Sequence, residues 1–309
     1  MVSAVFHSPS DASDAMRAEK AAGKFSSNAM TSAVTAGATP ASSAKPAAAP
    51  KTPIDWSALA ITVLSPIAGL AILVGIWHLL TMKSTTFPTP GQTWDAAVVL
   101  FSDPFYDNGP NDQGIGWNIW YSLKRVAMGF GLAAMVGIPM GFIIGRSKVI
   151  GSMLNPIISL LRPVSPLAWL PIGLLVFKSA DPAAIWTIFI CSIWPMIINT
   201  AVGVQRVPDD YLNVAKVLNL SEWKIVTKIL FPSVLPYMLT GVRLSVGTAW
   251  LVIVAAEMLT GGVGIGFWVW DEWNNLNVAH IIIAIFVIGI VGLLLEQLLM
   301  LVAKRFSYE

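Results

Sequence analysis

The sequence predicts an all-α membrane protein with about six transmembrane helices. Of its 309 residues, 55% are hydrophobic and only 12% are charged, whereas a soluble domain usually carries about 25% charged residues. Several apolar stretches reach the roughly 20 residues that a helix needs to cross a bilayer. We interpret these stretches as helices because only helices and closed barrels satisfy the backbone hydrogen bonds of a segment in lipid.

The first 52 residues differ from the rest and predict a disordered cytoplasmic tail, which leaves residues 53–309 as the membrane domain. The stretch is rich in Ala, Ser, Thr and Pro and poor in large apolar residues, so it cannot bury enough surface to offset the entropy of ordering. It lacks the continuous apolar core of a secretory signal peptide, and Asp11, Asp14 and Glu19 argue against a transit peptide.

Six apolar segments follow in order. The first contains one histidine, His78, which we interpret as a packed polar residue rather than a ligand. The third is interrupted by Arg162-Pro-Val-Ser-Pro166, and proline breaks the helical hydrogen-bond pattern. The sixth carries only one acid, Glu296, within its apolar run. The predicted spans are 59–82, 117–145, 150–177, 182–204, 231–259 and 278–303.

The distribution of Lys and Arg predicts that both termini are cytoplasmic. With that orientation the outer loops, including 83–116 and 260–277, contain only Lys83 and Lys178 as basic residues. Loops rich in Lys and Arg stay on the cytoplasmic side of a membrane. The outer loops instead carry acids, which are Asp95, Asp103, Asp107, Asp112, Asp181, Asp271 and Glu272.

The loop between the fourth and fifth spans predicts two short helices joined by a turn, at about 208–230. Asp209 or Asp210 can cap the first helix after Pro208. Asn219 stands where a left-handed residue would end that helix, and Asn tolerates this conformation better than most residues. Ser221 then caps the second helix.

Each of these two helices has a predicted apolar face. The first face consists of Leu212, Ala215 and Leu218, and the second of Trp223, Val226 and Ile229/Leu230, before Pro232 opens the fifth span. An alternative is a helix lying on the inner leaflet, which favours a broad Lys-rich face. Acids are mixed with bases in this segment, which favours docking to a soluble protein.

The segment resembles the cytoplasmic signature of ABC-importer permeases: Glu-Ala-Ala, three residues, Gly, nine residues, Ile, one residue, Leu-Pro. The matching positions are Asn213-Val-Ala215, Asn219, Ile229 and Phe231-Pro232. The spacing is intact, and Asn219 in place of Gly keeps the left-handed turn accessible. Because Asn213 replaces the Glu of the signature, the usual contact of that Glu is not assigned.

The resemblance covers roughly residues 56–309. The stretch Ser122-Leu-Lys-Arg-Val-Ala-Met-Gly-Phe130 is similar to the start of the transport core in taurine, sulfonate and nitrate permeases. Three further stretches resemble the nitrate and bicarbonate branch; they are Trp194-Pro195 with Asn199-Thr200, Asn213–Leu218 and Ala249–Leu259. The resemblance implies a transmembrane domain like that of type I ABC importers, in the bilayer of the bacterial inner membrane.

The resemblance also implies partners. Two copies would form the pore, cytoplasmic ATPase subunits would dock on the helix pair, and an extracytoplasmic binding protein would deliver the solute; no nucleic acid is implied. The sequence has no G-x-x-x-x-G-K-S/T motif, so we expect no catalytic residue, metal or cofactor here, with ATP and Mg²⁺ used by the partner. The implied docking residues are Tyr211, Leu212, Ala215, Lys216, Leu218, Asn219, Leu220 and Trp223.

Ionisable residues inside spans are costly and therefore mark candidate functional sites. Arg suits planar oxyanions because its fork can bond two oxygens at once. Two alternatives are structural: Arg162 can cap helix carbonyls at the Pro163/Pro166 kink, and Arg125 can pair with Glu257. The candidate anion path consists of Arg162, Arg243, Lys124, Arg125 and Glu257.

Taken with the resemblance, these charges predict the permease of an importer for nitrate or nitrite, with bicarbonate, cyanate or sulfonate as alternative substrates. An ion-coupled secondary transporter is a rival of another class, but the chain shows no two halves with matching broken helices. A membrane-embedded enzyme is disfavoured because no H-E-x-x-H, paired His or Ser/His pattern lies in the spans.

Overall fold

The computed structural model describes residues 56–109 and 112–306, and these residues form helices and loops without a strand. Residues 63–309 form one compact unit. The predicted tail, residues 1–52, lies outside the described residues. The predicted all-α fold is therefore confirmed for the membrane domain.

By length and composition, five helices are apolar enough to cross a membrane, and a bent pair of helices brings the number to six if the pair is one span. The pair consists of α5 (Lys148–Leu161) and α6 (Pro166–Phe177), which meet at 97°. The bend coincides with Arg162-Pro-Val-Ser-Pro166, so the predicted break of the third span is confirmed. The single helices are α2 (Trp56–Thr81), α4 (Ile115–Arg146), α7 (Ala180–Gln205), α10 (Phe231–Thr260) and α12 (Val278–Phe306).

Two further helices lie in stretches that the sequence analysis treated as outer loops: α3 (Pro90–Leu100) and α11 (Ile265–Asn274). A capping box begins α3, in which Gln92 N–H donates to Thr89 Oγ1 at 3.4 Å and Thr89 N–H donates to Gln92 Oε1 at 2.9 Å. Thr, Pro and Gln at these positions are a recognisable start signal, so the sequence did contain the information for α3.

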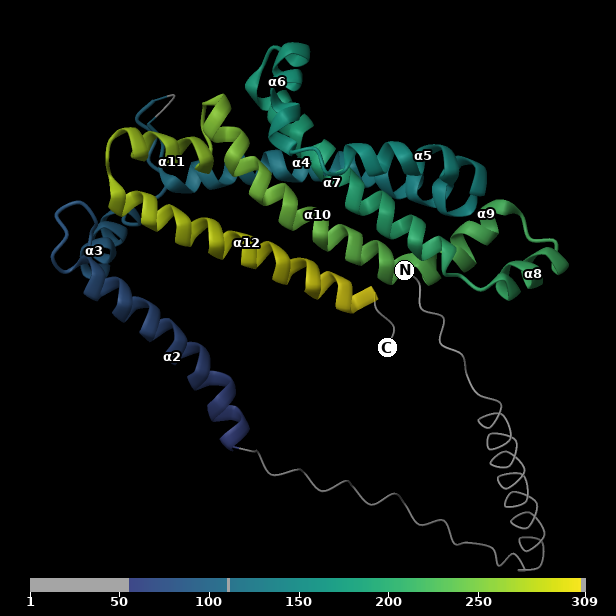
Figure 1. The fold of residues 1–309 in the computed structure, drawn as a ribbon, viewed down its shortest axis with the longest axis horizontal. Coiled ribbons are helices and arrows are strands. Elements are labelled where there is room, and N and C mark those ends of the chain that lie inside the picture. The colour runs from purple at the N-terminus through teal and green to yellow at the C-terminus, as the bar shows by residue number, and fades with distance from the viewer. Residues whose placement is uncertain (1–55, 110–111, 307–309) are drawn as a thin grey trace, which may run out of the picture. The chain divides into compact units, whose positions relative to one another are not determined.

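Helix α7 packs along both α4 and α10 (Figure 1). On α4 the contact runs over small residues at every fourth position, and small residues let membrane helices approach closely. A Cβ at Gly141 would lie 2.5 Å from Cβ of Thr200, so a larger residue cannot fit without separating the helices. The stripe consists of Gly129, Ala133, Gly137, Gly141 and Gly145.

Gly141→Val is therefore expected to destabilise the membrane domain in detergent by about 1–3 kcal/mol through overpacking. Gly131 lies on the same helix with open space around its Cα, so Gly131→Val is the matched control for the change in helix propensity. Thermal unfolding of both variants measures the difference. Equal midpoints would show that the α4–α7 contact is not as close as described.

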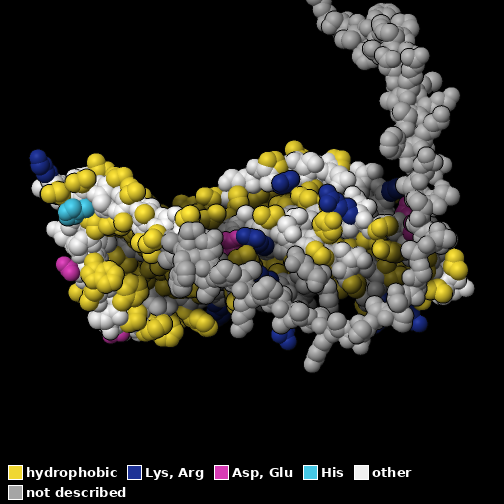
Figure 2. All heavy atoms as spheres, turned by 90° about the horizontal axis from the view of Figure 1, so that it is seen from below, with side chains coloured by type: hydrophobic (Ala, Val, Ile, Leu, Met, Phe, Trp, Pro, Cys, Tyr) yellow, Lys and Arg dark blue, Asp and Glu magenta, His cyan; other side chains and the backbone are white. Residues whose placement is uncertain are grey.

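The outer surface of the domain is largely apolar. Figure 2 shows one face on which hydrophobic side chains predominate and charged side chains are scattered. On α12 the exposed residues include Ile285, Ile290 and Leu298, while Trp250 Nε1 of α10 donates to Ile288 O at 2.9 Å and fastens α12 to the core. Large exposed apolar area is what a lipid-facing helix needs.

Candidate functional site

The helix pair between the fourth and fifth spans consists of α8 (Asp209–Val217) and α9 (Glu222–Ile225). Asn219 has φ of 49°, and the N–H groups of Leu220 and Asn219 donate to Ala215 O and Lys216 O, each at 3.0 Å. This pattern is the Schellman ending of a helix. Ser221 Oγ accepts from Lys224 N–H at 3.4 Å. The predictions for Asn219 and Ser221 are confirmed.

The predicted start of the first helix is wrong in one respect. Pro208 occupies the N-cap position and no side chain caps the helix. Asp209 and Asp210 lie in its first turn, because the fixed φ of Pro208 already sets the entry to the helix. Their carboxylates still favour the positive end of the helix dipole.

The predicted apolar faces need a correction. Ala215 is 0% exposed and packs inside the chain against Ile225 and Leu230, so its methyl group does not reach a partner. Trp223, which was predicted to share an apolar face with Val226 and Ile229/Leu230, is 75% exposed, whereas Leu230 is 1% exposed. Helix α8 folds back against α9. This tertiary contact buries the Ala215 side of the apolar face of α8.

An outward apolar face remains on the helix pair, and we call it the coupling surface. It combines three residues of the predicted docking set with two valines that the prediction missed. Val217 is its most exposed member, at 82%. Lys216 and Asn219 are exposed beside it, whereas Leu212 and Leu220 are half-buried. The coupling surface consists of Tyr211, Val214, Val217, Leu218 and Trp223.

The second helix of the pair continues directly into the fifth span. A π-helical turn, η1 (Val226–Leu230), joins α9 to α10, and the residues from Glu222 to Thr260 form one unbroken helical segment. Arg146 Nη2 at the end of α4 lies 2.6 Å from Glu222 Oε2. The helix pair is therefore connected directly to α10 and through one exposed ion pair to α4.

A buried polar cluster lies where α10 turns into α11. Glu257 is 1% exposed and its carboxylate accepts from three donors: Ser122 Oγ at 2.7 Å, Arg125 Nη1 at 2.6 Å and Gly266 N–H at 3.1 Å. Gly264 N–H donates to Asn118 Oδ1 at 2.9 Å. These hydrogen bonds hold the segment 261–266 against α4.

Arg125 is saturated by this cluster. Its Nε donates to Asp181 Oδ1 at 2.8 Å, and its Nη1 donates to Glu257 Oε1 and to Val263 O. The structural interpretation, that Arg125 pairs with Glu257, is therefore confirmed, and both residues hold the outer loop. The sequence analysis missed Ser122 and Asn118, whose partners lie more than 130 residues away along the chain.

Glu257→Ala is expected to destabilise the domain by about 3–5 kcal/mol, since it leaves the Arg125 guanidinium buried beside one exposed acid. Arg146→Ala is the matched control because it breaks an exposed ion pair, with Glu222, and exposed pairs contribute about 0–1 kcal/mol. Thermal unfolding in detergent measures both. A similar small loss in the two variants would contradict the role of the cluster.

The other candidate cations divide into two kinds. Arg243 on α10 is paired with Glu296 on α12 and donates through Nε to Glu296 Oε1 at 2.9 Å. Lys124 is exposed on α4 and lines none of the principal cavities. Arg162 is exposed at the α5–α6 bend, and no side-chain hydrogen bond or ion pair of its guanidinium is found within residues 56–109 and 112–306. The proposed capping of carbonyls by Arg162 is therefore not seen.

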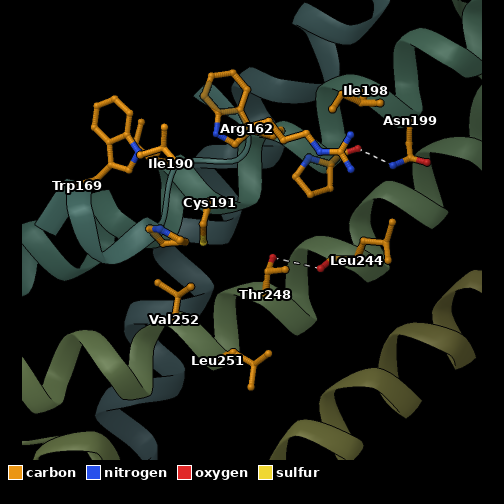
Figure 3. A pocket seen from close by; sticks show the side chains of 14 residues that line it. Arg162, Trp169, Ile190, Cys191, Ile198, Asn199, Leu244, Thr248, Leu251 and Val252 are labelled. Atoms are coloured by element: carbon orange, nitrogen blue, oxygen red, sulfur yellow. Dashed lines mark hydrogen bonds between the residues drawn. The ribbon is translucent and has the colours of Figure 1, made fainter. Parts of the chain in front are cut away.

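Arg162 lines a cavity of about 430 Å³ between the bent pair, α7 and α10. Figure 3 shows its guanidinium beside Asn199, with Thr248 and Cys191 deeper along the same cavity and Trp169 at the far side. Trp169 Nε1 is buried and has no hydrogen-bond partner among the described residues. The remaining residues that line the cavity are apolar. A bound anion would therefore meet few hydrogen-bond donors, of which the Arg162 guanidinium is charged.

Comparison with known proteins decides the family. Residues 137–308 match the family of inner membrane components of binding-protein-dependent transport systems. The chain belongs to that family. The matched region of this permease begins in the middle of α4 and includes the whole helix pair with the coupling surface.

The permease is also similar over most of its length to individual proteins. It is 49% identical to the nitrate import permease protein NrtB of Synechocystis sp., over 76% of this chain and 86% of that one. It is 46% identical to the bicarbonate transport system permease protein CmpB of the same organism, over 76% and 85%.

Solved structures share the fold at low identity. A bacterial ABC transporter involved in the import of alginate aligns with a TM-score of 0.54 and 14% identity, over 82% of this permease and 97% of that chain. The methionine ABC transporter MetNI aligns with a TM-score of 0.53 and 14% identity, over 62% and 95%. The permease therefore has the transmembrane fold of ABC importers, as predicted.

Proposed function

We propose that this permease is the membrane-spanning subunit of an ATP-driven importer of an inorganic oxyanion, with nitrate or nitrite as substrate. The observation that carries the proposal is its 49% identity to a nitrate import permease over most of both chains. Bicarbonate is the second candidate, on 46% identity to a bicarbonate permease. Cyanate and sulfonate are also monovalent anions and stay further alternatives.

The proposed assembly contains two copies of this chain, two cytoplasmic ATPase subunits on separate chains and an extracytoplasmic binding protein, in the bacterial inner membrane. The coupling surface supports the ATPase contact. Five apolar side chains on a polar helix pair form a patch with no cover among the described residues, and exposed apolar patches of this kind mark interaction sites.

Arg162 supports an anion path through the permease. It carries a guanidinium without an acidic partner among the described residues, in a cavity at the break of a span. Broken helices inside membranes are typical of substrate sites. Arg243, by contrast, is paired with Glu296, and Arg125 is hydrogen-bonded to Asp181 and Glu257 within the buried cluster.

Uptake assays test the substrate. In a strain that lacks the permease gene, a plasmid copy should restore uptake of nitrate at micromolar external concentration, and an excess of nitrite should compete while bicarbonate should not. Restored bicarbonate uptake without nitrate uptake would move the assignment to the second candidate. Restoration of neither would remove the oxyanion assignment.

The orientation of the chain is open to a labelling test. In a Cys191→Ala background, Asp107→Cys should react with an impermeant thiol reagent added to intact cells, whereas Ser307→Cys should react only after the cells are opened. This result follows from the excess of Lys and Arg in the proposed inner loops. Labelling of Ser307→Cys from outside would reverse the topology.

A further inference from the structure

Helix α5 carries a continuous polar stripe that neither the family match nor the coupling surface explains. Its members recur at intervals of four, three, four and three residues, which places them on one face of a helix. All five are exposed. The stripe consists of Lys148, Ser152, Asn155, Ser159 and Arg162.

A different face of α5 is suited to lipid. Val149, Met153 and Leu160 are exposed at 70%, 67% and 71%, and all are apolar. At 100° per residue, these side chains lie on average more than 90° around the helix from the stripe. A third face, with Gly151 and Ile158, is buried against the protein core. The polar stripe is therefore a separate face, which lipid would not solvate.

Three cavities follow one another along the stripe. The first is the Arg162 cavity described above. A second, of about 530 Å³, shares Arg162 with the first and is also lined by Asn155 and Ser159. A third, of about 630 Å³, shares Asn155 with the second and is also lined by Ser152 and Lys148. The stripe spans about 21 Å from Lys148 to Arg162 at 1.5 Å per residue, which is most of a bilayer core of about 30 Å.

The charges along this series of cavities favour anions. Arg162 stands at one end and Lys148 at the other. Between them the side chains of Asn155 and Ser159 can donate hydrogen bonds to an anion, whereas the hydroxyl of Ser152 already donates to Lys148 O at 2.8 Å. The residues that line the second cavity include no acid. In the third cavity Arg146 is paired with Glu222, so Lys148 is balanced by Asp209. The excess positive charge of the series therefore lies at Arg162, since no acid among the described residues lines the first two cavities.

We propose that the polar stripe of α5 lines a water-filled inner half of the translocation path, along which a planar oxyanion passes from Arg162 to the cytoplasm. The proposal rests on the function proposed above for the substrate and its direction. It adds that a specific helix face of this chain, and not only the binding protein, meets the anion. The alternative is that the polar stripe has no contact with water and packs against the second copy of the chain.

Thiol accessibility tests the stripe in the assembled complex with its ATPase subunits, in inside-out membrane vesicles. In a Cys191→Ala background, Ser152→Cys and Ser159→Cys report the stripe, and Met153→Cys and Leu160→Cys are matched controls on the lipid face. An impermeant sulfonate-bearing thiosulfonate should modify the stripe positions at least about tenfold faster than the controls. The rates of this anionic reagent and of a cationic trimethylammonium thiosulfonate are each divided by the reagent's rate with a free thiol in solution. At Ser159→Cys the anionic reagent should then have the higher relative rate, because positively charged walls concentrate anions.

Equal, slow modification of both faces would overturn the proposal, because the stripe would then be dry. Faster reaction of the cationic reagent at Ser159→Cys would overturn it as well. Nitrate uptake is measured in parallel with the complex that keeps Cys191, because Cys191 lines the Arg162 cavity. If that uptake is absent while the stripe is accessible, the substrate assignment fails and the water-filled path stands; if uptake is present and the stripe is inaccessible, only the stripe fails.

A second pair of variants reads out transport. Ser159→Leu would narrow the path along the stripe and exclude water from it. Leu160→Phe also adds bulk, but on the lipid-facing side of α5. Uptake should fall at least about tenfold in Ser159→Leu, with the ATPase still bound, and should stay near the parent value in Leu160→Phe. Normal uptake in Ser159→Leu would remove the stripe from the path.

Discussion

Arg162→Met is expected to reduce oxyanion uptake by about tenfold to a hundredfold while the complex still assembles. The guanidinium has no acidic partner within the described residues and lines the cavity at the α5–α6 bend. A charge-assisted contact with an anion contributes roughly 1.5–3 kcal/mol, and its loss weakens binding of the anion at this point of the path. Uptake rates and co-purification of the ATPase measure the two effects.

Two controls keep this prediction specific. Arg162→Lys retains the charge without the two-pronged fork, so it should keep part of the uptake. Lys124→Met removes an exposed cation that lines none of the principal cavities, so it should be close to neutral. Full uptake in Arg162→Met would exclude Arg162 from the path, and failure of the variant to assemble would make its role structural.

Val217→Asp is expected to release the ATPase subunits while the permease still inserts and folds. Val217 is 82% exposed on the coupling surface, so an aspartate there is solvated in the free permease. In the docked complex the same carboxylate would be buried without a partner, which costs at least about 2 kcal/mol, or about thirtyfold in affinity. Pull-down of the ATPase with the tagged permease measures the loss.

Ala215→Asp is the comparison variant, in which folding should be affected as well as docking. Ala215 lies in the interior of the helix pair beside Ile225 and Leu230, so a charge there should lower the thermal stability of the permease itself as well as docking. Val217→Thr, which is neutral and nearly isosteric, should keep the ATPase bound. Wild-type docking by Val217→Asp, with normal uptake, would contradict the coupling surface.

Features that depend on local sequence were predictable. The break of the third span follows from two prolines around Arg162, and the left-handed turn at Asn219 follows from its place after an amphipathic run. The capping box of α3 was equally legible in Thr89 and Gln92. In each case the deciding interaction spans no more than about one helical turn.

Features that depend on tertiary contacts were not predictable in the same way. Whether Ala215 or Val217 faces outward depends on how α8 folds against α9, and the two arrangements share the same helical periodicity. The cluster around Glu257 joins α4 to a loop more than 130 residues later. A charge pattern could suggest the Arg125–Glu257 pair but not the Ser122 and Gly266 donors that complete it.

Reconstitution tests the central claim that this chain forms the path but does not power it. Proteoliposomes would contain the permease and its ATPase, with binding protein and labelled nitrate outside and ATP with Mg²⁺ inside. Nitrate should accumulate above its external concentration with ATP, and should fail to do so with a hydrolysis-deficient ATPase or with the permease alone. Accumulation by the permease alone, driven by an imposed proton or sodium gradient, would contradict the account and favour a secondary transporter.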